Sequence, residues 1–392
     1  MPVLAFSPET AVETLEFKAD VLTDTLGEEQ RSRIRTAPRS LVELTISVED
    51  SDRSRLNALL YSAHTSALQS PSWWEATNLS QNLAAGTRNV WCTPSYRDFT
   101  VGGFGLLWSS PSVYEIFQVG ALSSVLIQMP SSGPALQNTW LQRDTRVMPL
   151  KSIFLGSEQG QTHYLMGLTE SKLRYTVVDN TDMRVANPTV FPTYLGKQLF
   201  NRVNSAEKTM SASWVSNAEV FDPGNLLAQA SSWTRPKVTQ AMRIVCKNQQ
   251  ATHETRAFFH LLGGRHKSFF MGTSKSDMHL NRDMGVGEGY LEIKHIGFVD
   301  NYGDFPSSPR GHLQVVFKDG TRSQYRINGT LPISSAAERV GVFPPVSPAI
   351  AMANVERIEF LTLCRLREDS VKITHLGRGR AVFEADVIGV PA

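Results

Sequence analysis

The chain has 392 residues, with 39 Lys and Arg against 37 Asp and Glu, so its net charge of +2 gives no overall field that would recruit nucleic acid or an anionic membrane. Three scattered cysteines fit neither a metal-binding pattern nor a disulfide framework, which indicates reduced thiols and folding in a cytoplasm. The start of the chain lacks a secretory signal and no apolar run reaches membrane-spanning length, so we expect a soluble protein without a membrane span.

Strands dominate the predicted elements. The first clear strand covers residues 41–49, where apolar and polar side chains alternate strictly, as they do in a strand with one buried face. Residues 241–247 repeat this alternation. Two hairpins are predicted further along the chain, over 312–328 with its turn at Asp319-Gly320, and over 371–387 with Gly377 and Gly379 at the turn.

Two helices interrupt these strands, one near residues 52–63 and one near 251–262. In each, apolar residues recur at the spacing that places them on one face of a helix. These residues are Leu56, Leu59, Leu60 and Ala63 in the first helix, and Phe258, Leu261 and Leu262 in the second. The pair Gly263-Gly264 supplies a stop for the second helix.

The surroundings of the two helices match. Each helix follows an alternating strand that begins near a Pro-Arg or Arg-Pro pair, and each precedes another strand-like stretch, at 64–74 and at 265–274. We infer that a β-α-β unit is duplicated, with its copies about 200 residues apart, which is too far for a solenoid repeat. The sequence therefore predicts two related domains, with Leu60 and Leu262 both buried beneath their helices.

The predicted fold is mainly β and has three parts. Residues 1–140 form a first β-sandwich or barrel domain with the helix near 52–63 packed on it. Residues 141–210 form a small β-domain and a linker, since this stretch holds little helix and ends in a Pro-rich segment. Residues 211–392 form a second β-sandwich or barrel domain with the helix near 251–262.

The sequence shows no motif for catalysis, for a metal or for a cofactor. Residues 101–108 lack the third glycine of a dinucleotide-binding loop, and His253-Glu254 is not followed by the second histidine of a zinc-protease motif. Asp300 and Asp304 resemble part of a calcium loop, but Tyr302 stands where an oxygen ligand is needed. We therefore predict no catalytic, metal-binding or cofactor-binding residues and no enzymatic activity.

One short segment near the start changes abruptly from acidic to basic. The charged residues that we single out in it are Glu16, Asp20, Asp24, Arg31, Arg33, Arg35 and Arg39. In an extended chain the first three of these arginines project to one side, and such a row can bind phosphates. Because the whole chain is nearly neutral, we prefer pairing of the acidic and basic strands, either with each other or with the same segment of a neighbouring copy. A solvated charged loop is the alternative.

Three stretches of the chain carry a resemblance to a known family. Glu29-Gln30-Arg31, followed by Arg35 and by Ala37-Pro38-Arg39, resembles a motif of tail-tip proteins from long-tailed bacteriophages and phage-like gene transfer agents. Residues 263–280 are similar to a strand end of that family, with Phe270 for the usual Trp and Gly272 for the usual Pro. Residues 364–390 resemble the closing hairpin of the family.

The resemblance implies a structural protein of the virion tail, of the distal tail or tail hub type, built from β-sandwich domains like those of the tail tube. Such a protein forms a ring at the end of the tube and has no active site. Its expected partners are copies of itself, in a ring of six or of three, together with the tail tube protein, the hub, other tail-tip proteins and the tape measure protein. The acidic-to-basic segment then becomes the interface between subunits.

Two other functions stay open. The Trp and Tyr content and the small middle β-domain fit a carbohydrate-binding module for host attachment, and buried aromatic residues would disfavour that function. A tail-associated hydrolase is the third possibility, which a cleft with paired carboxylates would favour.

Overall fold

The fold is known from a computed structural model, which describes residues 2–24, 28–63, 66–164, 167–183, 191–202, 212–222, 227–231, 233, 236–302, 310–377 and 379–390. Strands hold 51% of the described residues and helices 11%, so the prediction of a mainly-β protein is confirmed. We call the described residues up to 183 the first half and those from 191 onward the second half.

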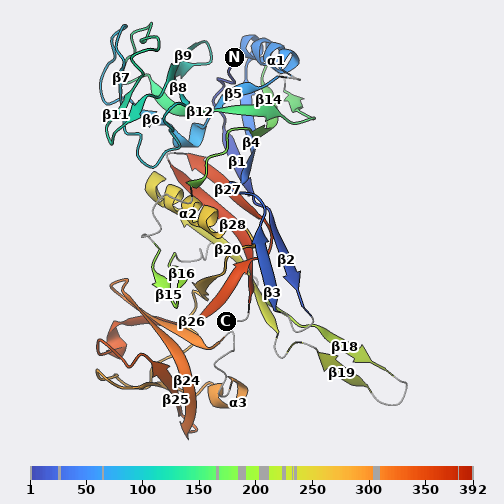
Figure 1. The fold of residues 1–392 in the computed structure, drawn as a ribbon, viewed down its shortest axis with the longest axis vertical. Coiled ribbons are helices and arrows are strands. Elements are labelled where there is room, and N and C mark those ends of the chain that lie inside the picture. Colours follow the sequence, from blue (N-terminus) through green and yellow to red (C-terminus); the bar gives the residue numbers. More distant parts are fainter. Residues whose placement is uncertain are drawn as a thin grey trace.

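One antiparallel sheet runs through both halves (Figure 1). In spatial order its strands are β13 (Gly160–His163), β14 (Thr169–Val177), β4 (Arg39–Val48), β1 (Thr10–Glu16), β27 (Ser370–Gly377), β28 (Arg380–Gly389), β20 (Lys237–Cys246) and β17 (Ala212–Val215). The first four come from the first half and the last four from the second. The halves meet where β1 pairs with β27, with Ala11 opposite His375 and Glu16 opposite Ser370.

Alternating side chains give this sheet one buried face. Along β4, Val42, Leu44, Ile46 and Val48 are buried while the residues between them are partly exposed, as the sequence predicts. β20 buries Met242, Ile244 and Cys246 in the same way, and these side chains pack in the core of the second half, which we call the second core. The predicted C-terminal hairpin is present as β27 and β28. The sheet does not close into a barrel within the described residues.

The two predicted helices are present, and a third short helix was not predicted. They are α1 (Asp50–Ser62), α2 (Gln249–Leu262) and α3 (Phe298–Tyr302). The side chain of Asn248 accepts a hydrogen bond from the backbone of Ala251 and caps the start of α2, which ends at Gly263 with a φ of 66°. In the part of the chain that the structure describes, no helix is both long and apolar enough to cross a membrane.

The two helices are buried to different extents. Leu262 on α2 is fully buried in the second core, as predicted. Leu60 on α1 is only half-buried at the margin of the first core, and Leu56 is the buried residue of that helix. The prediction that both leucines are buried is therefore correct for Leu262 and only partly so for Leu60, because α1 turns most of its surface to solvent.

In the first half, a second layer of strands packs across the core formed with β4 and β14. Its members are β5 (Leu68–Pro71), β6 (Thr77–Asn78), β8 (Phe104–Ser110), β9 (Val113–Gln118) and β12 (Arg146–Leu155). A short 3₁₀ turn, Trp73–Glu75, follows β5. A separate small sheet of β7 (Asn89–Trp91), β10 (Ala121–Leu122) and β11 (Leu126–Gln128) belongs to another core between residues 79 and 147.

The second half has a similar second layer and its own inserted sheet. The layer consists of β15 (Thr193–Tyr194), β16 (Lys197–Phe200), β21 (Phe269–Gly272) and β26 (Val355–Leu366). The inserted sheet consists of β22 (Tyr290–Lys294), β23 (His312–Phe317), β24 (Arg322–Ser334) and β25 (Ala337–Phe343), and it has its own core. β23 and β24 are the hairpin predicted around Asp319-Gly320. A 3₁₀ turn, Met352–Asn354, precedes β26.

Each half also carries a two-stranded ribbon. The first ribbon is β2 (Ala19–Thr23) paired with β3 (Glu29–Arg33), and the second is β18 (Ala218–Phe221) paired with β19 (Ala228–Ser231). The second ribbon projects away from the rest of the protein (Figure 1). The predicted domain boundaries at 140 and 210 stay predictions; β12 and β14 of the predicted middle domain pair with β5 and β4.

The unequal burial of the two helices predicts unequal mutational costs. Leu262→Ala should lower the free energy of unfolding by about 2–5 kcal/mol, because it leaves a cavity under α2. Leu60→Ala should cost roughly 1 kcal/mol, because solvent already reaches that side chain. Urea unfolding followed by circular dichroism measures both losses. Equal losses for the two variants would contradict the packing described for α1.

Candidate functional site

Arg256 on α2 reaches into the first half, where it meets two buried carboxylates. Its Nη2 atom lies 2.7 Å from Glu13 Oε1, and its Nη1 atom lies 3.4 Å from Glu75 Oε1. The Glu13 carboxylate on β1 also accepts a hydrogen bond from the Ser40 hydroxyl and lies 3.3 Å from His375 Nε2 on β27. These contacts tie β1, α2 and β27 together at the junction of the halves.

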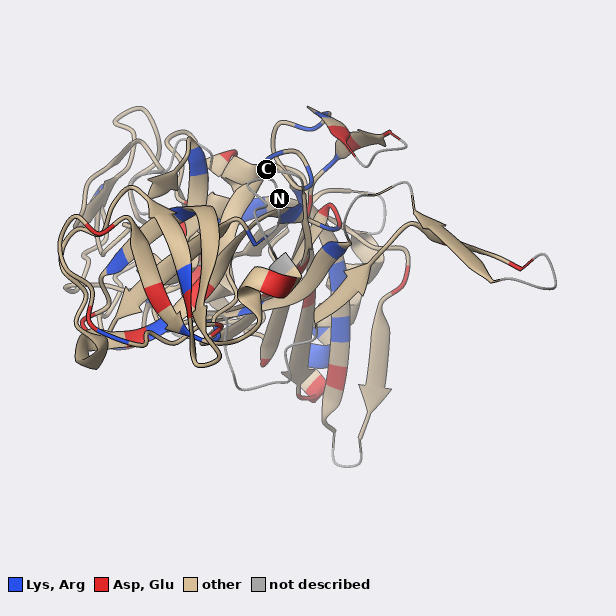
Figure 2. Cartoon of the chain, turned by 90° about the horizontal axis from the view of Figure 1, so that it is seen from below, with Lys and Arg blue, Asp and Glu red and all other residues tan. Residues whose placement is uncertain are grey.

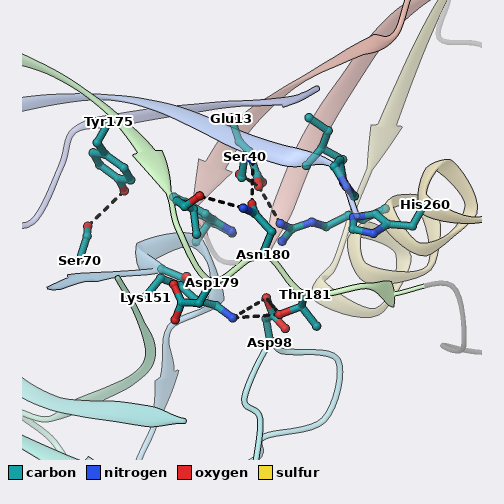
Figure 3. Close-up of a pocket in the computed structure, with 16 residues that line it drawn as sticks. Glu13, Ser40, Ser70, Asp98, Lys151, Tyr175, Asp179, Asn180, Thr181 and His260 are labelled. Carbon is teal, nitrogen blue, oxygen red and sulfur yellow. Dashed lines mark hydrogen bonds and ion pairs between the residues drawn. The ribbon is translucent and has the colours of Figure 1, made fainter. Parts of the chain in front are cut away.

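A second group of charges adjoins the first. Asp98 Oδ2 lies 2.9 Å from Lys151 Nζ, and the backbone N–H of Asp98 donates to Glu75 Oε2 at 2.7 Å. The Thr181 hydroxyl donates to Asp98 Oδ2 and accepts from Lys151 Nζ, each at 3.1 Å (Figure 3). We call Glu13, Glu75, Asp98, Lys151 and Arg256 together the central network.

The central network holds three carboxyl groups but only two cations, so full ionisation would leave one negative charge in surplus. Removal from water and the nearby Asp98 carboxylate raise the pKa of Glu75 to about 7. Glu75 is therefore the group that holds a proton in mildly acidic solution. Protonation of Glu75 makes the network electrically neutral.

Glu13, His260 and His375 each keep one charge state near neutral pH. Burial alone would raise the pKa of Glu13, but the Arg256 guanidinium and the hydrogen bond with His375 outweigh burial and lower that pKa to about 2. On α2, His260 Nδ1 accepts the backbone N–H of Met183 at 3.2 Å, and burial lowers the pKa of His260 to about 3. Burial also lowers the pKa of His375. Glu13 is thus charged and both histidines are neutral.

The space inside the network is small. The volume open to the centre of a water molecule is about 20 Å³, in a pocket that Glu13, Ser40, Lys151 and His260 help to line (Figure 3). That volume accommodates a water molecule and no sugar ring or peptide bond. We therefore interpret the paired carboxylates as part of a structural connection between the halves.

A wider cleft of about 730 Å³ is also lined in part by Trp74. Trp73, Arg97, Arg146 and Gln249 are among its lining residues, which come from both halves. Trp73 is only 8% exposed, and one face of Trp74 stacks on the His375 ring at a centroid distance of 4.5 Å. The cleft is wide enough for a small ligand, but little aromatic surface faces it.

The residues predicted as a subunit interface lie on and beside the first ribbon. The acidic and basic strands pair with each other in the same chain, with Asp20 opposite Ser32 and Val21 opposite Arg31. This is one of the two pairings that the sequence allows. Contact of the ribbon with a neighbouring copy stays a prediction.

The seven residues predicted as a subunit interface differ in their exposure to solvent. Glu16, Arg31, Arg33 and Arg35 are half-buried, whereas Asp20, Asp24 and Arg39 are exposed. Arg33 and Arg35 donate to backbone carbonyls of their own chain, including that of Glu16 for Arg35. Ser32, Ile34 and Thr36 between the arginines are exposed, which agrees with the predicted alternation.

The strongest ionic contact of the first ribbon was not predicted. Glu29 forms a two-pronged pair with Arg365 on β26, at 2.6 and 3.0 Å, and lies 3.2 Å from Lys237 Nζ on β20. Burial raises the pKa of Glu29, but the hydrogen bonds from Arg365 outweigh burial and lower it. Glu29 thus fastens the ribbon of the first half to the second half.

Sequence reasoning missed the central network because its members are far apart in the chain. One signal was available. Ala11, Glu13 and Leu15 share the buried face of β1, and an acidic residue between apolar ones on such a face needs a cation or donors. The position of Arg256 on α2 could not be matched to Glu13 without the strand order.

Among the described residues, no group of three or more His, Cys, Asp and Glu side chains is placed to hold a metal ion. No protein-family model matches the chain, and no curated protein matches its sequence. The geometry of the chain itself therefore carries the functional argument.

The raised pKa of Glu75 predicts a pH dependence of stability. The folded protein binds this proton more tightly than the unfolded chain, so the contribution is complete below the ordinary glutamate pKa and is lost as the pH rises through about 7. Between pH 5 and pH 8 wild type should lose about 3 kcal/mol relative to Glu75→Gln.

Thermal and urea unfolding of wild type and Glu75→Gln at both pH values tests this prediction. His260 and His375 also titrate on unfolding, but they are present in both proteins and cancel in the difference. A difference between the two proteins that does not change with pH would mean that Glu75 is ionised throughout the range.

Proposed function

We propose that this chain is a structural component of a bacteriophage tail tip, of the distal tail or tail hub type. In this proposal copies of the chain form a ring that joins the tail tube to the hub and to the receptor-binding parts. The observation that carries the proposal is a repeat within the main sheet, in which two like groups of strands follow one another head to tail.

The two groups have the same internal pairing. In the first half β13, β14, β4 and β1 are neighbours in that order, and in the second half β27, β28, β20 and β17 are. In each half the last strand is followed by a ribbon at the same interval, from Glu16 to Ala19 and from Val215 to Ala218. We take this as support for the duplicated β-α-β unit.

The inserted parts of the two halves share a backbone hydrogen-bonding pattern. In each, the backbone N–H of a glycine with positive φ donates to a carbonyl later in the chain. The residue three positions before that glycine exchanges two hydrogen bonds with the residue four positions after the acceptor. The residues are Gly86, Leu136, Leu83 and Trp140 in the first half, and Gly287, Val346, Met284 and Ile350 in the second. A shared pattern of irregular bonds favours common descent over chance.

The second ribbon supports assembly with other copies. Val220 and Phe221 on β18 are more than half exposed, and Leu227 just before β19 is 74% exposed; the ribbon itself projects from the protein. An isolated two-stranded ribbon is only marginally stable in water. Exposed apolar side chains on such a ribbon are typical of a surface that packs against another protein.

The distribution of charge fits a structural protein better than one that recognises nucleic acid. Basic and acidic residues are interspersed through the chain (Figure 2). A DNA-binding protein gathers its basic residues on one face. In the proposal the partners are the tail tube protein, the hub, other tail-tip proteins and the tape measure protein, the location is the virion tail, and there is no enzymatic activity.

A carbohydrate-binding module for host attachment is the alternative function. The cleft of about 730 Å³ beside Trp73 and Trp74 favours it, but the packing of both rings against the protein weakens it. A tail-associated hydrolase finds less support, because the space beside Glu13 and Asp98 is about 20 Å³, which is too small for a substrate.

Two measurements test the proposed function. Mass photometry of the purified protein should show a closed species of six, or of three, times the chain mass of 43.5 kDa. Antibodies against the protein should label the tip of the tail in virions viewed by electron microscopy. A protein that stays monomeric at micromolar concentration, or labelling of the capsid, would refute the proposal.

A further inference from the structure

The junction between the two halves is made by strands that have neighbours on both sides. β1 lies between β4 and β27, and β27 lies between β1 and β28. The equivalent strands in the repeat are β17 for β1 and β13 for β27. Within the described part of the chain β17 pairs only with β20, and β13 pairs only with β14. The sheet thus ends in two open edges, β17 and β13. The strands equivalent to them, β1 and β27, pair with each other inside the chain.

We propose that copies of this chain join head to tail by pairing β17 of one copy with β13 of the next, so that the junction inside each chain is repeated between chains. The inference rests on the proposed function, since it needs the repeat and the ring. A contact between two different surfaces of the same protein closes into a ring when its rotation allows. Pairing of open edges supplies backbone hydrogen bonds to both strands.

The strand registers fix which residues would meet. Val48 pairs with Thr169 in the first half, and Cys246 pairs with Ala381 in the second, so these pairs are equivalent. Their hairpin partners, His163 opposite Thr169 and His375 opposite Ala381, are then equivalent too.

The register of β1 against β27 can therefore be transferred to the new junction. Inside the chain Glu13 lies opposite Ile373. The equivalent of Glu13 is Ala212, because Glu16 and Val215 pair with the equivalent residues Arg39 and Lys237. The equivalent of Ile373 is Gln161. Ala212 of one copy should lie opposite Gln161 of the next.

The two ribbons show how each junction is fastened. Inside the chain Glu29 of the first ribbon binds Lys237 and Arg365 of the second half. The corresponding position of the second ribbon is Leu227, and the position that corresponds to Arg365 is Phe154 on β12, which is 51% exposed. An ionic contact inside the chain is thus matched by two exposed apolar side chains that would meet between copies.

Engineered cysteines test the pairing directly. Directly opposed residues of antiparallel strands have Cα atoms within the range that a disulfide spans. The variant with Ala212→Cys and Gln161→Cys together should form, under oxidation, a ladder of dimers, trimers and larger species on a non-reducing gel, and a reductant should return it to monomer. The native cysteines are all buried and leave the background low.

Each single cysteine variant is the matched control. In a head-to-tail contact Ala212 of one copy does not meet Ala212 of another, so neither single variant should form the ladder. Dimers from one single variant would indicate a symmetric contact and would overturn the proposal. A protein that forms rings without a ladder would overturn this junction and leave the proposed function standing, whereas a strictly monomeric protein would overturn both.

The apolar contact has a test of its own. Phe154→Glu should abolish assembly, measured as loss of the large species in mass photometry, while circular dichroism and the melting temperature stay as in wild type. Tyr61→Glu on the exposed side of α1 is the control and should assemble normally. Normal assembly of Phe154→Glu would show that β12 lies outside the junction.

Discussion

The buried guanidinium of Arg256 is the constraint on which the arrangement of the two halves depends. A cation taken out of water needs carboxylates at close range, and its two carboxylates, Glu13 and Glu75, belong to the other half. If the halves separated, Arg256 and the two carboxylates would each lose their partner of opposite charge. The halves therefore hold one relative position, and the sheet continues from one half into the other at β1 and β27.

Charged contacts of this kind select a register more than they add stability. A buried ion pair contributes little net energy compared with apolar packing, but a shifted register would leave a charge without a partner. Glu13 meets His375 and Arg256 only when β1 lies on β27 as observed. Apolar side chains such as Leu227 and Phe154 tolerate a shift of strand register more easily. This property suits an interface that assembles from separate copies.

Local patterns in the sequence predicted the elements well. The alternation in β4, the spacing of Phe258 and Leu262 and the turn at Asp319-Gly320 each depend on neighbouring residues, and each is present in the structure. The prediction did not reach the central network, the Glu29 cluster or α3. Glu29 and Arg365 are 336 residues apart in the sequence, and no pattern among neighbouring residues predicts such a contact. The charged segment was recognised, and pairing of its two strands with each other was one of the two predicted options, but its attachment to the second half through Glu29 was not predicted.

The pairing of β1 with β27 also sets the order of events during synthesis. β1 ends at Glu16 and its partner β27 begins at Ser370, so β1 leaves the ribosome long before its partner is made. At about 5–20 residues per second, β1 waits on the order of 20–70 s for β27. Until then one edge of β1 has no partner, and Glu13 lacks its contact with His375. A chain that stops before β27 cannot complete its sheet, so only copies that include β27 present the finished surfaces from which an assembly can be built.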